Sequence, residues 1–252
     1  MMTERLFSVA GRVACVTGAS SGLGRRAALT LARNGAHVIA VARREAELEV
    51  LAAEGDGRIS PLAADLTDRD AIAEIARQAA LPLGAPQILI NAAGVNTRQP
   101  ADEVTADGWD LTLTLNLSTP FFLAQALSPA MAEAGWGRIV NFASLQSYRA
   151  FKAGIAYGAS KGGVAQMTRA MAEAWSAKGI TANALGPGFF ETELTAAVFA
   201  DPELAGRNAA QTCMGRNGRP EDLDGPLLFL CSDASAYVTG QILMVDGGFT
   251  AK

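Results

Sequence analysis

Short apolar runs, rich in Val and Ile, alternate along the chain with longer stretches of helical length. Strands that are buried on both faces of a parallel sheet read as such continuous apolar runs. The alternation is typical of repeated βαβ units. We therefore predict an α/β fold, with one doubly wound parallel sheet of seven strands and helices on both faces. The predicted strands cover residues 12–17, 37–42, 59–63, 88–91, 138–144, 181–185 and 242–246.

Ala-rich and Leu-rich stretches between these runs predict the helices. They cover residues 24–34, 67–80, 105–134 and 156–178. The segment 189–218 has weak periodicity and many turn residues, so we expect a mobile cap or substrate loop there. With no internal repeat and no linker composition, the 252 residues predict a single domain, 1–252.

Composition and charge exclude several classes of protein. Half the residues are hydrophobic, and 21 Lys and Arg against 25 Asp and Glu give a net charge of −4. Without a basic cluster, nucleic acid is not an expected partner. No apolar stretch is long enough for a membrane span or a signal peptide, so we expect a soluble cytoplasmic protein without membrane partners. The three cysteines lack metal-like spacing, which predicts no metal site.

A glycine-rich turn follows the first predicted strand. Glycine lets the backbone turn tightly and approach a pyrophosphate, whose charge faces the free N–H groups of the next helix. The spacing G-x-x-x-G-x-G is related to the common dinucleotide fingerprint but differs from it. We predict a dinucleotide site here, although the turn alone also fits a structural role. Its residues are Gly18, Ser20, Ser21, Gly22, Leu23 and Gly24.

The end of the second strand indicates which dinucleotide binds. An acid there would hold the ribose hydroxyls of NAD, whereas cations suit the 2′-phosphate of NADP. Arg43 and Arg44 follow Ala42, and no acid occurs before Glu45. We expect NADP(H) with Arg43 as the main contact; the alternative is two solvated loop arginines. Asp65 and Leu66, after the third strand, bracket the adenine in this interpretation, although Asp65 could instead cap a helix.

Tyr157 and Lys161 are four residues apart in a predicted helix, so both project from one face. At about 4–5 Å and an effective dielectric constant near 20, the lysine charge would stabilise tyrosinate by roughly 3–4 kcal/mol. We therefore expect Lys161 to lower the pKa of Tyr157, so that the phenol exchanges protons near neutral pH. Ser144 stands at the carboxyl end of a predicted strand, where doubly wound sheets place their ligands. Its hydroxyl could orient a carbonyl oxygen.

Together these motifs, in this order, resemble the short-chain dehydrogenase/reductase family over essentially the whole chain. The resemblance implies a Rossmann-type fold and hydride transfer between nicotinamide and a carbonyl or secondary alcohol. It also implies a homotetramer, and the apolar circumference of the helices 105–134 and 156–178 favours burial against another subunit. The matching segments are 17–24, 91–94, Asn116, Ser144, Tyr157 with Lys161, Asn183, 187–188, 237–240 and 245–248.

The resemblance also implies roles for single residues. Catalysis would use Asn116, Ser144, Tyr157 and Lys161, with Asn116 holding a proton-relay water. Asn91 and Asn116 also have ordinary explanations, as a turn residue and a buried amide that satisfies backbone. Cofactor contacts would further include Lys161 and Tyr157 at the ribose. The remaining cofactor residues implied are Asn91, Ala92, Gly94, Pro187, Gly188, Phe190 and Thr192.

The substrate is the least constrained expectation, because its pocket is built from variable positions. A mixture of aromatic and hydrogen-bonding groups suits a small ketone or a sugar acid. The chain is similar to sugar-acid dehydrogenases of the gluconate type and to 3-oxoacyl-carrier-protein reductases. The second function ranks lower, because residues 131–137 offer no cation to an acidic carrier protein. A non-catalytic NADP sensor ranks below both. By analogy the pocket includes Asn96, Ser144, Gln146, Tyr148, Arg149, Ile155, Phe189, Leu194 and Phe199.

Overall fold

Seven parallel strands form the centre of the molecule. The computed structural model describes residues 5–252. The strand order is β3-β2-β1-β4-β5-β6-β7, and every neighbouring pair is parallel. The order reverses between β1 and β4, which is where such sheets open a ligand crevice. The strands are β1 (Val13–Thr17), β2 (His37–Ala42), β3 (Ile59–Ala63), β4 (Ile88–Asn91), β5 (Gly137–Phe142), β6 (Ile180–Pro187) and β7 (Ile242–Val245).

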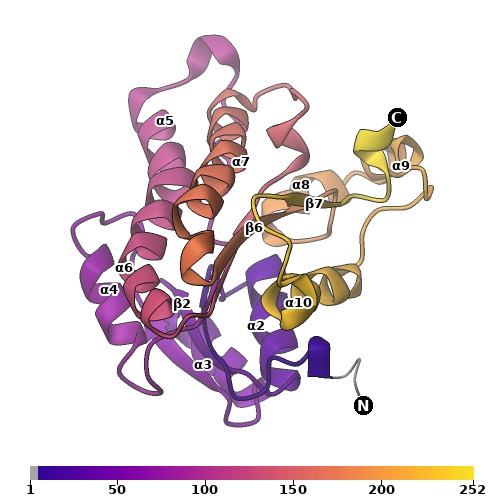
Figure 1. Ribbon diagram of the computed structural model, residues 1–252. Helices are drawn as coiled ribbons and strands as arrows, with labels where there is room; N and C mark the ends of the chain where they lie inside the picture. Colours follow the sequence, from indigo (N-terminus) through magenta and orange to yellow (C-terminus); the bar gives the residue numbers. More distant parts are fainter. Residues whose placement is uncertain (1–4) are drawn as a thin grey trace.

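Helices cover both faces of this sheet (Figure 1), so the predicted fold class is confirmed. Leu31, Leu48 and Leu227 belong to the core beneath one face, which α2 (Gly22–Arg33), α3 (Glu45–Glu54) and α10 (Asp224–Cys231) cover. Ile75, Leu123 and Met171 belong to the core beneath the other. That face is covered by α4 (Ile72–Ala79), α6 (Thr119–Glu133) and α7 (Ile155–Trp175).

The predicted helix 105–134 is not continuous. A π-helical turn, Thr114–Ser118, separates α5 (Ala106–Leu113) from α6. Such turns insert one extra residue and often mark functional sites. The turn contains Asn116, whose side chain is buried at 1% exposure. Periodicity alone does not show such an insertion.

The predicted helix 67–80 begins only at Ile72. Two carboxylates compete with the helix for its backbone donors. Asp65 accepts hydrogen bonds from the Thr67 backbone N–H at 2.9 Å and from the Thr67 hydroxyl at 2.8 Å. Asp68 accepts one from the Asp70 N–H at 3.1 Å. These bonds hold residues 65–71 as turns.

The fifth strand ends at Phe142, two residues before the predicted end at Ser144. Ser144 instead caps a short 3₁₀ turn, Leu145–Ser147, and its hydroxyl accepts a hydrogen bond from the Gln146 N–H at 3.1 Å. In the other direction, β6 extends to Pro187 rather than to residue 185. Residues 143 and 144 therefore belong to the loop at the carboxyl edge of the sheet, and β6 extends further toward the same edge, where the cavity described below lies.

Two helices of the described residues outside the segment 189–218 were not predicted. In α3 the buried Leu48 and Leu51 are three residues apart among charged residues, a helical spacing that the sequence did offer. In α10, Leu227–Leu230 is an apolar run without polar residues, so the sequence shows neither a helical nor a strand period there.

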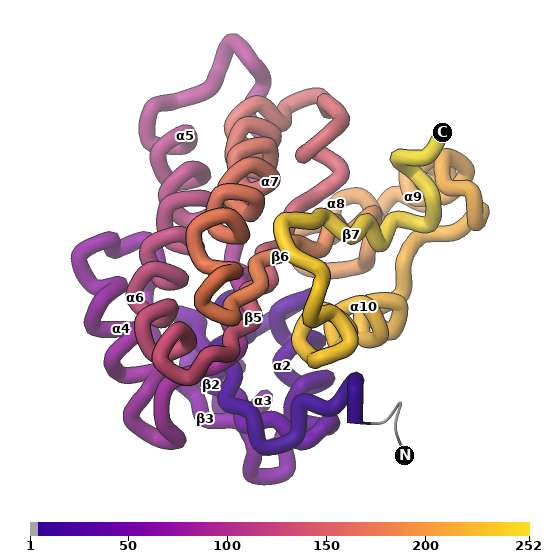
Figure 2. The backbone as a smooth tube through the Cα atoms, viewed as in Figure 1, coloured from indigo at the N-terminus to yellow at the C-terminus, as the bar shows by residue number. Residues whose placement is uncertain are grey.

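The predicted cap is a folded unit rather than a loop. Residues 189–218 contain α8 (Ala196–Phe199) and α9 (Pro202–Gln211), and α9 lies near the C-terminus (Figure 2). The unit closes on itself where the Gly218 N–H donates to the Phe189 carbonyl at 2.8 Å. The Asn217 amide donates to the Ala205 carbonyl at 3.0 Å. Across residues 5–252, no helix combines the length and apolarity that a membrane crossing requires.

Candidate active site

One cavity of about 970 Å³ connects the glycine turn with Ser144, Tyr157 and the cap. It lies at the carboxyl edge of the sheet, over the point where the strand order reverses. A single volume therefore joins the predicted cofactor and catalytic groups. The predicted residues that line it are Gly18, Ser20, Ser21, Gly22, Leu23, Gly24, Arg43, Arg44, Asp65, Leu66, Ala92, Gly94, Asn96, Ser144, Gln146, Tyr157, Lys161, Pro187, Gly188, Phe189, Phe190, Thr192 and Leu194.

Several predicted substrate residues lie outside this lining. Arg149 is exposed and stacks over the Phe249 ring at 5.8 Å. On α8, Val198 lines the cavity and Phe199 does not, so the helix presents the neighbouring side chain. Tyr148 and Ile155 are largely exposed and also lie outside it.

The glycine turn has space only for glycine. A Cβ at Gly18 would lie 2.8 Å from the Ala93 backbone, and a Cβ at Gly24 would lie 2.3 Å from the Gly18 carbonyl oxygen. Gly18 also has φ of +68°, which glycine adopts without strain. The helix behind the turn, α2, has no side-chain cap at Ser21, so its first N–H groups stay available. These features fit a dinucleotide pyrophosphate.

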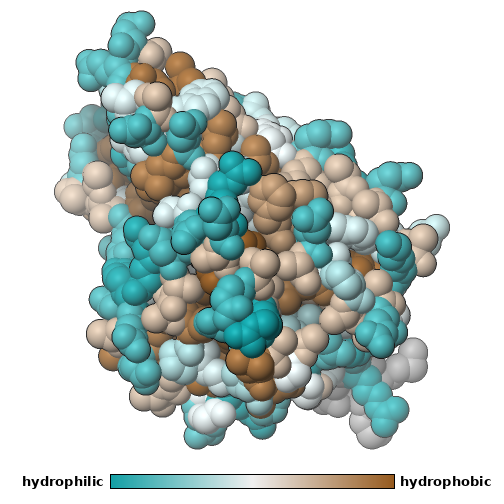
Figure 3. All heavy atoms as spheres, turned by 90° about the vertical axis from the view of Figure 1, so that its left-hand side faces the viewer, coloured by the Kyte–Doolittle hydropathy of each residue, from teal (hydrophilic) through white to brown (hydrophobic). Residues whose placement is uncertain are grey.

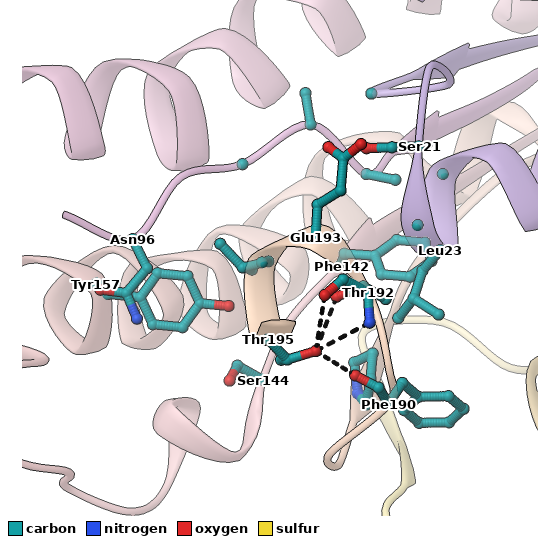
Figure 4. Close-up of a pocket in the computed structure, with 18 of the residues that line it drawn as sticks. Ser21, Leu23, Asn96, Phe142, Ser144, Tyr157, Phe190, Thr192, Glu193 and Thr195 are labelled. Carbon is teal, nitrogen blue, oxygen red and sulfur yellow. Dashed lines mark hydrogen bonds between the residues drawn. The ribbon is translucent and has the colours of Figure 1, made fainter. Parts of the chain in front are cut away.

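The two arginines after β2 differ in their surroundings. The Arg44 guanidinium makes two 3.0 Å contacts with the Glu193 carboxylate and also donates to the Ser20 hydroxyl at 3.1 and 3.2 Å. Glu193 belongs to the cap and points toward Ser21 (Figure 4). This pair joins the cap to the glycine turn. Hydrogen bonding to Arg44 lowers the pKa of Glu193.

Arg43 is exposed and lines the cavity beside Asp65. It forms no side-chain hydrogen bond or ion pair with residues 5–252, which leaves its guanidinium available. The hydrogen bond from the Thr67 backbone is the main reason that the pKa of Asp65 is lowered, and Arg43 lowers it further. Asp65 thus both holds the turn after β3 and lines the cavity, which combines the two roles considered for it.

Ser144 and Tyr157 face each other across the catalytic end of the cavity (Figure 4). Because the Ser144 hydroxyl already accepts from the Gln146 N–H, its own hydrogen remains free to donate. Burial raises the pKa of Tyr157. A hydrogen bond with Ser144 and the positive charge of Arg98 oppose that rise. The pKa of Tyr157 is thus raised rather than lowered, and the Lys161 charge is not among the causes, so the predicted lowering by Lys161 is wrong.

Lys161 is itself buried, at 5% exposure. Its ammonium donates to the Phe142 carbonyl at 2.6 Å and lies 5.6 Å from the centre of the Tyr157 ring. Desolvation lowers the pKa of Lys161 to about 8. The lysine is thus partly deprotonated in mildly alkaline solution, a property that the sequence spacing did not indicate.

Asn91 and Asn116 are buried beneath the cavity rather than in its lining. The Asn91 amide donates to Asn141 Oδ1 at 2.9 Å and joins β4 to β5. Asn116 Oδ1 accepts from the Val95 N–H at 2.8 Å, and its amide donates to the Val95 carbonyl at 2.9 Å and to Ser160 at 3.0 Å. Asn116 therefore fixes the loop beside Lys161, in agreement with the ordinary explanation given above.

Three polar residues of the substrate end were missed from the sequence: Arg98, Lys152 and Asn208 all line the cavity. Arg98 has φ of +51° and donates to the Leu194 carbonyl at 2.8 Å, which connects it to the cap. Lys152 precedes Ala153, whose φ is +52°. Backbone strain of this kind is concentrated at functional sites. For Arg98 and Lys152 the sequence did offer a signal, since each is a loop cation close to a motif: Arg98 to residues 91–94 and Lys152 to Tyr157.

Comparisons with known proteins agree with this arrangement. The family described as enoyl-(acyl carrier protein) reductase matches residues 18–250. Gluconate 5-dehydrogenase of Gluconobacter oxydans is 41% identical over 98% of both chains. The 3-oxoacyl-[acyl-carrier-protein] reductase of Thermotoga maritima is 36% identical over 94% of this chain and 97% of its own. A crystal structure of gluconate 5-dehydrogenase from Burkholderia cenocepacia, in complex with NADP and tartrate, is 34% identical with a TM-score of 0.95 over 99% of both chains.

The chain belongs to the short-chain dehydrogenase/reductase family. It is an oxidoreductase with a Rossmann-type sheet. The predicted family and enzyme class are therefore confirmed. The expected cofactor, NADP, is the one bound in the related crystal structure.

Proposed function

We propose that this single-domain chain is an NADP(H)-dependent oxidoreductase that interconverts a secondary alcohol and a ketone on a sugar acid. The observation that carries the proposal is the single cavity that joins the glycine turn, Arg43 and the Ser144–Tyr157 pair.

The cofactor contacts follow from the lining. The N–H groups at the start of α2 would hold the pyrophosphate. Arg43, which has no partner among the described residues, would contact the 2′-phosphate. Asp65 and Leu66 would lie at the adenine, and Pro187 through Thr192 at the nicotinamide end. Lys161 would donate to the ribose hydroxyls with a buried ammonium.

Bound nicotinamide supplies the hydride in reduction and accepts it in oxidation. In reduction, Ser144 donates a hydrogen bond to the substrate carbonyl oxygen and holds it beside Tyr157. Tyr157 then gives its phenolic proton to that oxygen. The tyrosinate left behind is stabilised by Ser144 and by the charge of Arg98. In oxidation the same phenolate accepts the alcohol proton.

The charges at the substrate end support an acidic substrate. Arg98 and Lys152 both line this end, whereas the nearby acid, Glu193, is paired with Arg44. A carboxylate would be attracted by the two cations, and Arg98 is near enough to Tyr157 to lower its pKa. The amides of Gln146 and Asn208 also favour a hydroxylated molecule over the acyl chain of a carrier-protein reductase.

For assembly and location we propose a cytoplasmic homotetramer. Large apolar side chains are exposed on the face formed by α5 and α6, where brown patches interrupt the polar surface (Figure 3). Leu111 is 40% exposed and Phe122 is 36% exposed. Contact with other copies of the chain would cover them. Light scattering at low micromolar concentration tests this; a monomeric mass would contradict it.

The proposed substrate class is tested by comparing D-gluconate with the neutral polyol galactitol, each with NADP⁺, in wild type and in Arg98→Leu. We expect wild type to oxidise gluconate with the higher kcat/KM. In Arg98→Leu the gluconate to galactitol ratio of kcat/KM should fall about tenfold or more, because a charged hydrogen bond is lost. Absence of any gluconate oxidation by wild type would overturn the proposal.

A further inference from the structure

Asn208 is a buried polar residue on the inward face of the cap helix α9. The residue is 6% exposed, and it lines the cavity. Leu204, Asn208 and Thr212 are spaced four apart and form the inward stripe of this segment. An amphipathic helix normally carries an apolar residue in the middle of such a stripe. The amide is therefore an exception to the pattern of its own helix.

This amide has no hydrogen-bond partner among residues 5–252. Other buried asparagines in the described part of the chain do have partners: Asn141 donates to Thr168 at 3.0 Å, and Asn183 donates to the Val238 carbonyl at 2.8 Å. The Asn208 amide atoms are not among the buried polar atoms that lack a partner, so they are open to the cavity rather than enclosed in protein. Because the Asn208 side chain borders the cavity, a molecule in the cavity can supply the missing partner.

Apolar side chains line the cavity from the same cap and from the segment before it. Leu204 and Val198 line the cavity from the cap, and Phe189 and Phe190 line it from the segment after β6. The cap hydroxyls of Thr192 and Thr195 also line the cavity but bond to each other and to the cap backbone, whereas the Asn208 amide makes no such bond.

A second amide with unused bonding capacity lies on another wall of the same cavity. Gln146 follows Ser144 by two residues and lines the cavity. Its Oε1 atom is buried beside Gly154, but its NH₂ group is not among the buried atoms and donates no hydrogen bond within residues 5–252. Gln146 projects from the loop after β5, whereas Asn208 belongs to the cap. A ligand that bonds to both amides must carry polar groups along its length.

We propose that Asn208 is a specificity-determining residue that hydrogen-bonds a hydroxyl group of the substrate's carbon chain, away from the carbonyl held by Ser144 and Tyr157. This inference rests on the proposed function and narrows it to polyhydroxylated acids. The cap thereby distinguishes a sugar acid from an unsubstituted keto acid of the same length.

The test compares two six-carbon keto acids with NADPH: 5-keto-D-gluconate, which carries hydroxyls, and 5-oxohexanoate, which has none. The measured quantity is the ratio of their kcat/KM values. In Asn208→Leu we expect this ratio to fall about 10- to 100-fold, the equivalent of roughly 1.4 to 2.8 kcal/mol. The melting temperature should not fall, because leucine removes an amide without protein partners from an apolar wall.

Asn217→Leu is the matched control. Asn217 belongs to the same cap but is not part of the cavity lining, and its amide donates to the Ala205 carbonyl. We expect this variant to lower the melting temperature and to leave the substrate ratio unchanged.

The outcomes separate the two proposals. If wild type reduces 5-keto-D-gluconate and Asn208→Leu keeps the wild-type ratio, the assignment of Asn208 is wrong while the sugar-acid function stands. A lowered melting temperature with an unchanged ratio would make Asn208 a structural residue, and the assignment is wrong then too. If wild type does not reduce 5-keto-D-gluconate, the proposed function fails and the Asn208 assignment fails with it.

Discussion

The two ends of the cavity are built on different principles. At the glycine turn, backbone atoms approach so closely that a single Cβ would meet a carbonyl oxygen at 2.3 Å. At the cap, side chains of two short helices form the wall, and a polar residue, Asn208, stands where an apolar one would pack. Close backbone contacts restrict the turn to one conformation. The ligand that the cap accepts depends instead on a few side chains, which can be substituted.

The two ends therefore have different functions within one reaction. The turn binds a part of the cofactor that is the same in every catalytic cycle, and it gains from rigidity. The cap selects the substrate. The catalytic residues lie between them, on α7 and in the loop after β5, so substitutions at each end should affect different measured quantities.

The largest effect is expected between the two ends, at Tyr157. Tyr157→Phe removes the proton donor and keeps the ring, so kcat should fall about 10²- to 10⁴-fold. NADPH affinity, measured by fluorescence titration, should change little. Turnover close to wild type would mean that another group moves the proton.

At the turn, Gly24→Ala should weaken NADPH binding and lower stability by roughly 1–3 kcal/mol, because the added methyl group overlaps the Gly18 carbonyl. Gly225→Ala in α10 is the control, since no atom lies within 4 Å of its added Cβ. Chemical denaturation and NADPH titration measure both variants. Equal behaviour of the two would refute the close-approach argument.

Lys161 predicts a pH dependence of stability. Its pKa is about 8 in the folded chain and near 10.4 in an unfolded one. Between these values the unfolded chain holds more protons, so stability rises with pH by up to about 1.4 kcal/mol per unit. Lys161→Met removes this contribution. Chemical denaturation of both proteins from pH 7.5 to 9.5 should therefore show that the stability of wild type, relative to that of the variant, increases with pH. A constant difference in stability would contradict the lowered pKa.

The smallest effect is expected where the cap meets the turn. Glu193 pairs with Arg44 beside the predicted phosphate site, so Glu193→Gln should remove a competing negative charge. Such exposed pairs contribute at most about 1 kcal/mol. NADPH should bind up to about fivefold more tightly. Glu74→Gln, which breaks the exposed pair with Arg77, serves as the control and should not change NADPH binding.

The contrast between the two ends also explains how much the sequence could predict. Glycines, buried strands and the Tyr157–Lys161 spacing impose local rules, so the sheet and nearly all of the expected cofactor lining were recognisable. Phe199 and Arg149 were misplaced because the orientation of a short helix or an exposed loop depends on packing. Asn208 was missed because an isolated asparagine carries no local signal. The Lys161 pKa depends on burial, which spacing does not reveal.

The central claim is that one cavity combines NADP(H) with a sugar acid. The most direct measurement is the steady-state oxidation of NADPH and of NADH by wild type with 5-keto-D-gluconate. We expect turnover with a clear preference for NADPH, and a loss of that preference in Arg43→Ala. Preferential use of NADH by wild type, or no turnover with either cofactor, would contradict it.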